Sequence, residues 1–233
     1  MSAVRELLQR LGLHGLDRRI KRSLGIRKHG VIHPPYGPEA QRGIDAVDDV
    51  ARYGAIALAV ARLQKEGIEG EFAEVGVYKG ELSQFLASIA PERRLHLFDT
   101  FSGFAETDAE SRQEALGDTR FRDTSVEGVR QRLGSLAARV SFHAGWFPDT
   151  ATELGEERFA FVMLDLDKYK PTLAGLQLFY PRLVRGGYLF LHDYNSPESN
   201  HGVSRALHEF LADKPELPVE LPDRCGSVVL RKL

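Results

Sequence analysis

Short apolar segments alternate with helical patterns through most of this chain, and this alternation constrains the fold more than any other sequence feature. Five segments rich in Val, Leu, Phe and Ile are predicted strands, at residues 71–78, 93–101, 139–145, 159–167 and 187–194. Strands that are apolar along their whole length and joined through helices are typical of a parallel sheet covered on both faces. The sequence therefore predicts an α/β fold.

The predicted helices lie before, between and after these strands. They cover residues 45–66, 80–90, 124–136, 149–154, 171–183 and 204–214, where apolar residues recur at helical spacing. Two further β segments, 218–223 and 227–233, are separated by only a few residues. Because so short a connection cannot make a parallel crossover, we expect an antiparallel hairpin at the end of the sheet.

The first 43 residues differ from the rest, and we expect an N-terminal arm over 1–43 and one domain over 44–233. The arm combines an apolar stripe with a cluster of basic residues, Arg18, Arg19, Lys21, Arg22, Arg27 and Lys28. Residues 30–43 contain three prolines and three glycines, which predicts an irregular connection. The arm could cover the active site, mediate dimerisation, meet an acidic ligand, a partner or nucleic acid, or present a solvated face, and the sequence leaves these alternatives open.

Composition excludes several classes of protein. With 42% apolar and 27% charged residues, and no stretch of about 20 apolar residues, the sequence predicts a cytoplasmic globular protein without a membrane span. A net charge of −2 makes nucleic acid an unlikely partner for the whole molecule. Cys225 is the single cysteine, so it can form no intrachain disulfide, and we expect it to be buried.

A glycine pair follows the first predicted strand and opens a helix. Gly76 and Gly80 permit a sharp turn and close approach of a ligand, although the segment lacks the middle glycine of a dinucleotide-binding motif. Glu74 before the first glycine suits a cationic or zwitterionic ligand. The second strand ends in Asp99, which at this place in such a sheet typically accepts hydrogen bonds from ribose hydroxyls. Near the third strand end, Trp146 and Phe147 could hold a flat base.

The fourth and fifth strands also run directly into polar residues. Asp165 ends the fourth, whereas His192 and Asp193 end the fifth. Because parallel strands bring their carboxyl ends to one edge of a sheet, these residues predict a single site. Asp167 is expected either to assist that site or to cap the following helix. His143 and His201 are weaker candidates.

The sequence resembles class I S-adenosylmethionine-dependent methyltransferases, and more narrowly the macrocin O-methyltransferase (TylF-type) family. The resemblance rests on the order and spacing of GEFAEVGVYKGE, LFDTFSGF, DTSVEGVRQRL, HAGWFPDT, LDLDKYKPT, YPRLVRGGYLFLHDY and GVSRALHEFL, within about residues 45–233. It implies a Rossmann-like fold with a seven-stranded, mostly parallel sheet, and a cofactor, S-adenosylmethionine. The residues implied to bind it are Glu74, Gly76, Val77, Tyr78, Gly80, Asp99, Thr100, Ser102, Gly145, Trp146, Phe147 and Asp165.

The same resemblance implies a divalent metal held by Asp165, His192 and Asp193, with Asp165 and His192 as catalytic residues. His192 stands where the family usually has aspartate, and this departure puts the metal in doubt. One carboxylate fewer favours Mn²⁺ or another ion that tolerates imidazole over Mg²⁺. Alternatively, His192 is itself the general base of a metal-free reaction.

These inferences predict an enzyme that methylates a hydroxyl of a sugar or another small polar natural-product intermediate. An NAD-linked oxidoreductase and an RNA-associated binding protein are the alternatives, and the missing G-x-G-x-x-G pattern disfavours the first. The expected partner is a small-molecule hydroxyl acceptor, and a homo-oligomer is possible. The sequence does not identify the acceptor.

Overall fold

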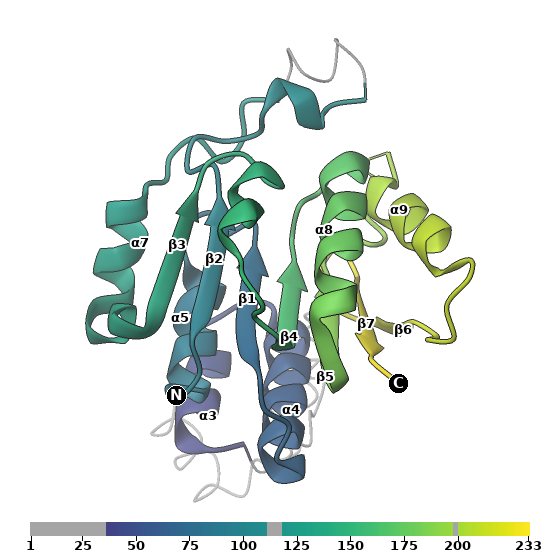
Figure 1. Ribbon diagram of the computed structural model, residues 1–233. Helices are drawn as coiled ribbons and strands as arrows, with labels where there is room; N and C mark the ends of the chain where they lie inside the picture. Colours follow the sequence, from purple (N-terminus) through teal and green to yellow (C-terminus); the bar gives the residue numbers. More distant parts are fainter. Residues whose placement is uncertain (1–35, 111–117, 198–199) are drawn as a thin grey trace, which may run out of the picture. The chain divides into compact units, whose positions relative to one another are not determined.

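A computed structural model describes residues 36–110, 118–197 and 200–233, which form one seven-stranded sheet with helices on both faces (Figure 1). The strand order is β3-β2-β1-β4-β5-β7-β6. The first five strands pair in parallel, and β7 is antiparallel to both β5 and β6. The predicted fold class and C-terminal hairpin are confirmed. The strands are β1 (Glu71–Val75), β2 (Leu95–Asp99), β3 (Val140–Ala144), β4 (Phe159–Leu164), β5 (Leu183–Leu191), β6 (Val219–Leu221) and β7 (Ser227–Arg231).

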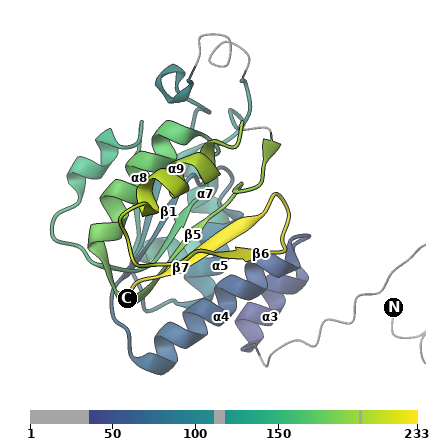
Figure 2. The same cartoon turned by 90° about the vertical axis from the view of Figure 1, so that its right-hand side faces the viewer.

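Two helical layers cover the sheet, and Figure 2 shows α8 and α9 on one side of it and α3, α4 and α5 on the other. The α-helices are α3 (Pro38–Asp45), α4 (Val50–Glu66), α5 (Glu81–Ile89), α7 (Val126–Leu133), α8 (Tyr169–Arg182) and α9 (Gly202–Leu211). Short 3₁₀ helices are η1 (Glu106–Asp108), η2 (Gly134–Arg139) and η3 (Asp149–Glu153). Among the described residues, none of these helices combines the length and apolar character needed to span a bilayer.

The core consists of two apolar clusters, one on each face of the sheet. On β4, Phe161 and Met163 pack toward α4, α5 and α7, whereas Val162 and Leu164 pack toward α8 and α9. All of these β4 side chains are at most 1% exposed. Burial of both faces explains why the central strands are apolar at consecutive positions, as the sequence predicted.

Two helix boundaries differ from the sequence prediction. Residues 38–43, expected to be irregular, belong to α3, because Pro38 suits a first helical turn and Ile44 is buried against the core. The helix expected from residue 45 begins instead at Val50, where the side chain of Asp49 accepts a hydrogen bond from the Arg52 amide at 3.2 Å. The basic cluster of the arm lies outside the described residues, and a division at residue 43 stays a prediction.

The C-terminal end of β1 contacts the C-terminal end of β4, at the edge where both strands leave the sheet. Gly76 has φ +88°, and a Cβ at this position would lie 1.9 Å from the carbonyl oxygen of Asp165. The Asp165 amide in turn donates to the Val75 carbonyl at 2.8 Å. Glycine is therefore required at position 76 by a neighbouring backbone, in addition to any need for ligand access.

We predict that Gly76→Ala lowers the free energy of unfolding by about 3 kcal/mol or more, because it adds a backbone collision to an unfavourable φ. Urea denaturation measures the loss. Gly67→Ala is the matched control, because Gly67 also has positive φ, at +63°, but no atom lies within 4 Å of its added Cβ. That variant should lose only about 1 kcal/mol. Equal losses in the two variants would contradict the steric explanation.

Candidate active site

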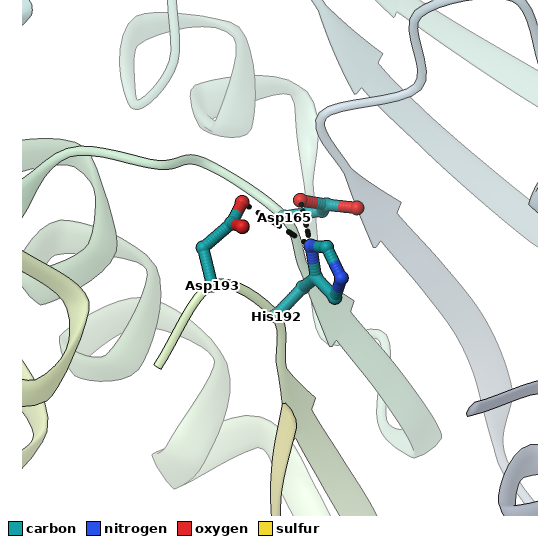
Figure 3. A group of neighbouring side chains, drawn as sticks. All are labelled: Asp165, His192 and Asp193. Carbon is teal, nitrogen blue, oxygen red and sulfur yellow. Dashed lines mark hydrogen bonds and ion pairs between the residues drawn. The ribbon is translucent and has the colours of Figure 1, made fainter. Parts of the chain in front are cut away.

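The ends of β4 and β5 bring together the three residues that the sequence suggested as a metal site. His192 Nδ1 lies 3.1 Å from Asp165 Oδ1 and 3.2 Å from Asp193 Oδ2 (Figure 3). One ligand atom from each residue lies within 4.8 Å of the others. The strand pairing fixes this arrangement, because the His192 amide donates to the Leu164 carbonyl at the end of β4. The predicted meeting of these side chains is confirmed.

The hydrogen bonds of His192 define what can lie between it and the carboxylates. Its Nε2 lies 3.0 Å from the carbonyl oxygen of Arg224, which can only accept, so Nε2 carries a proton. Nδ1 therefore faces two carboxylates either with a second proton or with a lone pair directed at a bound cation. The residues present thus fit a divalent ion, with the Arg224 carbonyl orienting the imidazole ring.

The pKa of His192 follows from the same contacts. Burial lowers it, but the negative charge of Asp165 and hydrogen bonds to Asp165 and Asp193 outweigh burial and raise the pKa to about 11. Without a metal, the imidazolium itself is the cation that neutralises the two acids. His192 then has no free lone pair with which to act as a general base.

Arg52 is a residue of this site that the sequence did not suggest. Its Nη1 lies 3.3 Å from Asp165 Oδ2, and its Nε lies 3.3 Å from Asp49 Oδ2 at the start of α4. The guanidinium therefore holds the Asp165 oxygen that does not contact His192. Only the fold brings α4 to the end of β4, so no local sequence signal marked this contact.

A cavity of about 410 Å³ opens beside these residues and extends along the ends of β1 and β2. A volume of this order suits one small organic ligand. Most of the predicted cofactor residues line it, namely Glu74, Gly76, Val77, Tyr78, Asp99, Thr100, Trp146, Phe147 and Asp165, as do His192 and Asp193. Gly80, Ser102 and Gly145 do not line the cavity. Gly80 instead precedes the first residue of α5, and the Gly145 amide donates to the Asp99 carbonyl.

Asp99 organises the loops around the cavity. Its Oδ2 accepts hydrogen bonds from the Val77 and Tyr78 amides at 2.7 and 2.9 Å, and its Oδ1 accepts one from the Phe101 amide at 2.7 Å. Oδ1 also lies 3.5 Å from Thr100 Oγ1, but that hydroxyl donates at the shorter distance of 2.6 Å to the Gly103 carbonyl, so Oδ1 is the less strongly engaged oxygen. The carboxylate therefore fixes the turn after β1 as well as the turn after β2.

Glu74 of β1 places a buried carboxyl group in the lining of the cavity. The side chain is 2% exposed, and its Oε2 accepts a hydrogen bond from Ser83 Oγ at 2.6 Å. Burial raises the pKa of Glu74 to about 8, although the Ser83 hydrogen bond opposes this, and the nearby charges of Asp165 and Asp99 raise it further. A cationic ligand beside Glu74 would favour its charged form.

Trp146 lines the cavity together with Asp108, an acid that the sequence did not suggest as a site residue. The indole Nε1 donates to Asp108 Oδ1 at 2.8 Å, while Asp108 Oδ2 accepts from the Ala105 amide at 3.1 Å. This pair fixes the indole ring in the cavity wall. Phe147 also lines the cavity, but it is 5% exposed and packs in the apolar core.

Asp167 lines the cavity, and its predicted role as a helix cap is wrong, because Lys168 occupies the cap position of α8. Burial raises the pKa of Asp167 to about 8, with further contributions from the charges of Asp193 and Asp165. Asp167 and Asp193 both have φ +58°, a left-handed conformation that few non-glycine residues adopt, although aspartate adopts it more often than most. Backbone strain of this kind is concentrated at functional sites.

Three other sequence candidates lie elsewhere or differ from expectation. Cys225 was expected to be buried, but it is exposed and lines the cavity, because a tight turn at φ +63° places it at the tip of the β6–β7 hairpin. His143 is buried between His96 and Glu153, at 3.0 and 2.9 Å, away from the cavity lining. His201 is exposed and precedes the first residue of α9.

Comparison with known proteins identifies relatives of this chain. A family described as Macrocin-O-methyltransferase (TylF) matches residues 48–225. Mycinamicin III 3''-O-methyltransferase of Micromonospora griseorubida is 30% identical over 161 residues, which cover 63% of this chain and 62% of that protein. An 8-demethyl-8-(2,3-dimethoxy-alpha-L-rhamnosyl)-tetracenomycin-C 4'-O-methyltransferase of Streptomyces olivaceus is 32% identical over 142 residues, 55% of this chain and 54% of that protein. The chain thus matches less than two thirds of either relative.

Solved structures support the fold independently. The structure of the O-methyltransferase NovP aligns with a TM-score of 0.70 and 24% identity, covering 78% of this chain and 80% of that one. The structure of CalS11, a calicheamicin methyltransferase, aligns with a TM-score of 0.58 and 20% identity, over 88% and 97% of the two chains. At these identities the likeness concerns the fold alone.

We predict that His192 remains doubly protonated at pH 8 in protein freed of metal by EDTA. Its pKa of about 11 lies above the ordinary value of about 6.5, so this charge contributes stability below pH 6.5 that is lost as pH rises through 11. Imidazole ¹⁵N chemical shifts measure the protonation state, with exposed His201 as the internal control. A His192 ring that is neutral at pH 8 in the metal-free protein would contradict the proposed ion pairs.

Proposed function

This chain belongs to the macrocin O-methyltransferase (TylF) family, and from that premise we propose that it transfers a methyl group from S-adenosylmethionine to a hydroxyl of a sugar-containing natural product. One observation carries the proposal. The acids expected at the donor, Glu74 and Asp99, and the residues expected at the acceptor, Asp165, His192 and Asp193, line one cavity.

The donor would occupy the part of the cavity formed by the ends of β1 and β2. Glu74 would accept hydrogen bonds from the ammonium group of the methionine moiety, and Asp99 Oδ1 would accept one from a ribose hydroxyl. Trp146, held by Asp108, would pack against the adenine base. Val77, Tyr78 and Thr100 line the space between these anchors.

The acceptor would approach at the ends of β4 and β5. Asp165, His192 and Asp193 would hold a divalent ion, which when bound lowers the pKa of a hydroxyl that coordinates it. Arg52 and the Arg224 carbonyl keep Asp165 and the His192 ring in place. In the transfer, the acceptor oxygen bonds to the methyl carbon, the carbon–sulfur bond breaks, and the hydroxyl proton passes to a carboxylate of the cavity. Alignment of the two reactants accounts for much of the rate enhancement.

The metal-free alternative, with His192 as the general base, is less well supported. Both ring nitrogens are already engaged, Nε2 by a carbonyl and Nδ1 by two carboxylates. Neither the oxidoreductase alternative nor the RNA-associated alternative gains support from the site. A screen of mycinamicin and tetracenomycin intermediates, the compounds named for the two relatives, for the mass gain of one methyl group tests the proposed reaction.

We predict that Glu74→Gln weakens binding of S-adenosylhomocysteine by roughly tenfold or more, because the ligand ammonium loses its charged partner. Isothermal titration calorimetry measures the dissociation constant. Glu71→Gln is the matched control, since Glu71 lies on the same strand but contacts His96 instead of the cavity. Equal affinities of the wild type and Glu74→Gln would remove the donor assignment at this end of the cavity.

We also predict that EDTA abolishes methyl transfer, and that Mn²⁺ restores it at a lower concentration than Mg²⁺. The imidazole ligand is the reason, because Mg²⁺ prefers a set of oxygen ligands. His192→Asp should shift the preference toward Mg²⁺. Electron paramagnetic resonance of added Mn²⁺ measures binding independently of activity. Full activity of the EDTA-treated enzyme would instead support the metal-free alternative.

A further inference from the structure

Tyr53 is a cavity residue to which neither the sequence motifs nor the proposed chemistry assigns a role. It lies in the first turn of α4, directly after Arg52, and its ring packs against Phe85 of α5 with centroids 4.9 Å apart. The side chain is 4% exposed. It nevertheless lines the cavity that contains Glu74 and Asp165.

The hydroxyl of Tyr53 makes no hydrogen bond to any residue that the structure describes. The hydroxyl oxygen is not among the fully buried polar atoms that lack a partner, so it reaches the open space of the cavity, where it can donate a hydrogen bond to a bound ligand. Burial raises the pKa of Tyr53 well above its ordinary value, and the neighbouring charges of Glu74 and Asp165 raise it further, against the opposing effect of Arg52. The phenol therefore stays protonated and is available as a hydrogen-bond donor.

The chemistry of the donor identifies what this hydroxyl meets. In S-adenosylmethionine, the ammonium and carboxylate groups are attached to the same carbon, so a carboxylate lies next to any ammonium held by Glu74. A carboxylate requires hydrogen-bond donors, and Glu74 cannot supply one in its charged form. The Arg52 guanidinium faces Asp49 through Nε and Asp165 through Nη1, so these two carboxylates share its charge. Tyr53 stands beside both Glu74 and Arg52 and carries the hydroxyl that lacks a partner.

We propose that Tyr53 binds the methyl donor, with its hydroxyl donating a hydrogen bond to the α-carboxylate of the methionine moiety. This inference rests on the proposed function, since it requires that the cavity bind S-adenosylmethionine. Glu74 and Tyr53 then recognise the two opposite charges of one zwitterion. Helix α4 thereby contributes to both halves of the reaction, through Tyr53 at the donor and Arg52 at Asp165.

The test compares two ligands that differ only in the carboxylate. Calorimetric titrations use S-adenosylhomocysteine and its decarboxylated analogue, S-adenosyl-3-thiopropylamine, with the wild type and Tyr53→Phe. The variant should bind S-adenosylhomocysteine roughly 10-fold more weakly but bind the decarboxylated analogue as the wild type does, because a hydrogen bond to a charged group is lost only with the first ligand. Tyr188→Phe is the matched control, since Tyr188 does not line the cavity.

Urea denaturation verifies that Tyr53→Phe is folded, which the unpartnered hydroxyl leads us to expect. The inference is overturned if Tyr53→Phe binds S-adenosylhomocysteine as tightly as the wild type. It is also overturned if the variant weakens both ligands by the same factor, because the hydroxyl would then act on something other than the carboxylate. Failure of the wild type to bind S-adenosylhomocysteine is a different result, and it would overturn the proposed function itself.

Discussion

The contact between the ends of β1 and β4 is the constraint on which the site depends. Gly76 passes so close to the Asp165 carbonyl that a side chain cannot fit between them. This contact places the loop after β1, which carries residues of the proposed donor site, directly beside Asp165 of the proposed acceptor site. The pairing of β4 with β5 then places His192 and Asp193 beside Asp165. Strand pairing in a buried sheet therefore sets the distance between the proposed donor and acceptor sites.

Acidic side chains outnumber basic ones in the cavity, whose basic residues are Arg52, Lys79, Arg120 and His192. Glu74, Asp99, Asp165, Asp167 and Asp193 all line it, and burial raises the pKa of both Glu74 and Asp167. Buried carboxyl groups in such density are unfavourable unless cations join them. A sulfonium donor, its ammonium group and a divalent ion are all cations, so the proposed reactants supply the missing charge.

Much of this arrangement could be predicted from the sequence, because it depends on local patterns. Apolar strands identified the sheet, and polar residues at their ends identified Glu74, Asp99, Asp165, His192 and Asp193. The sequence was less informative about residues whose place in the site depends on tertiary contacts. Arg52 and Tyr53 lie on an ordinary helix face, and only the packing of α4 against the strand ends brings them to the cavity. The exposure of Cys225 depends in the same way on the hairpin turn, which its surrounding residues did not reveal.

The central claim is that one edge of the sheet aligns a sulfonium donor with a cation-binding triad. The most direct measurement is X-ray diffraction from crystals grown with S-adenosylhomocysteine and Mn²⁺, with anomalous data collected at the manganese edge. We predict an anomalous peak bound by Asp165, His192 Nδ1 and Asp193, with the ligand sulfur in the same cavity and facing that ion. A ligand bound at another part of the molecule, or manganese absent from these three side chains, would contradict the account.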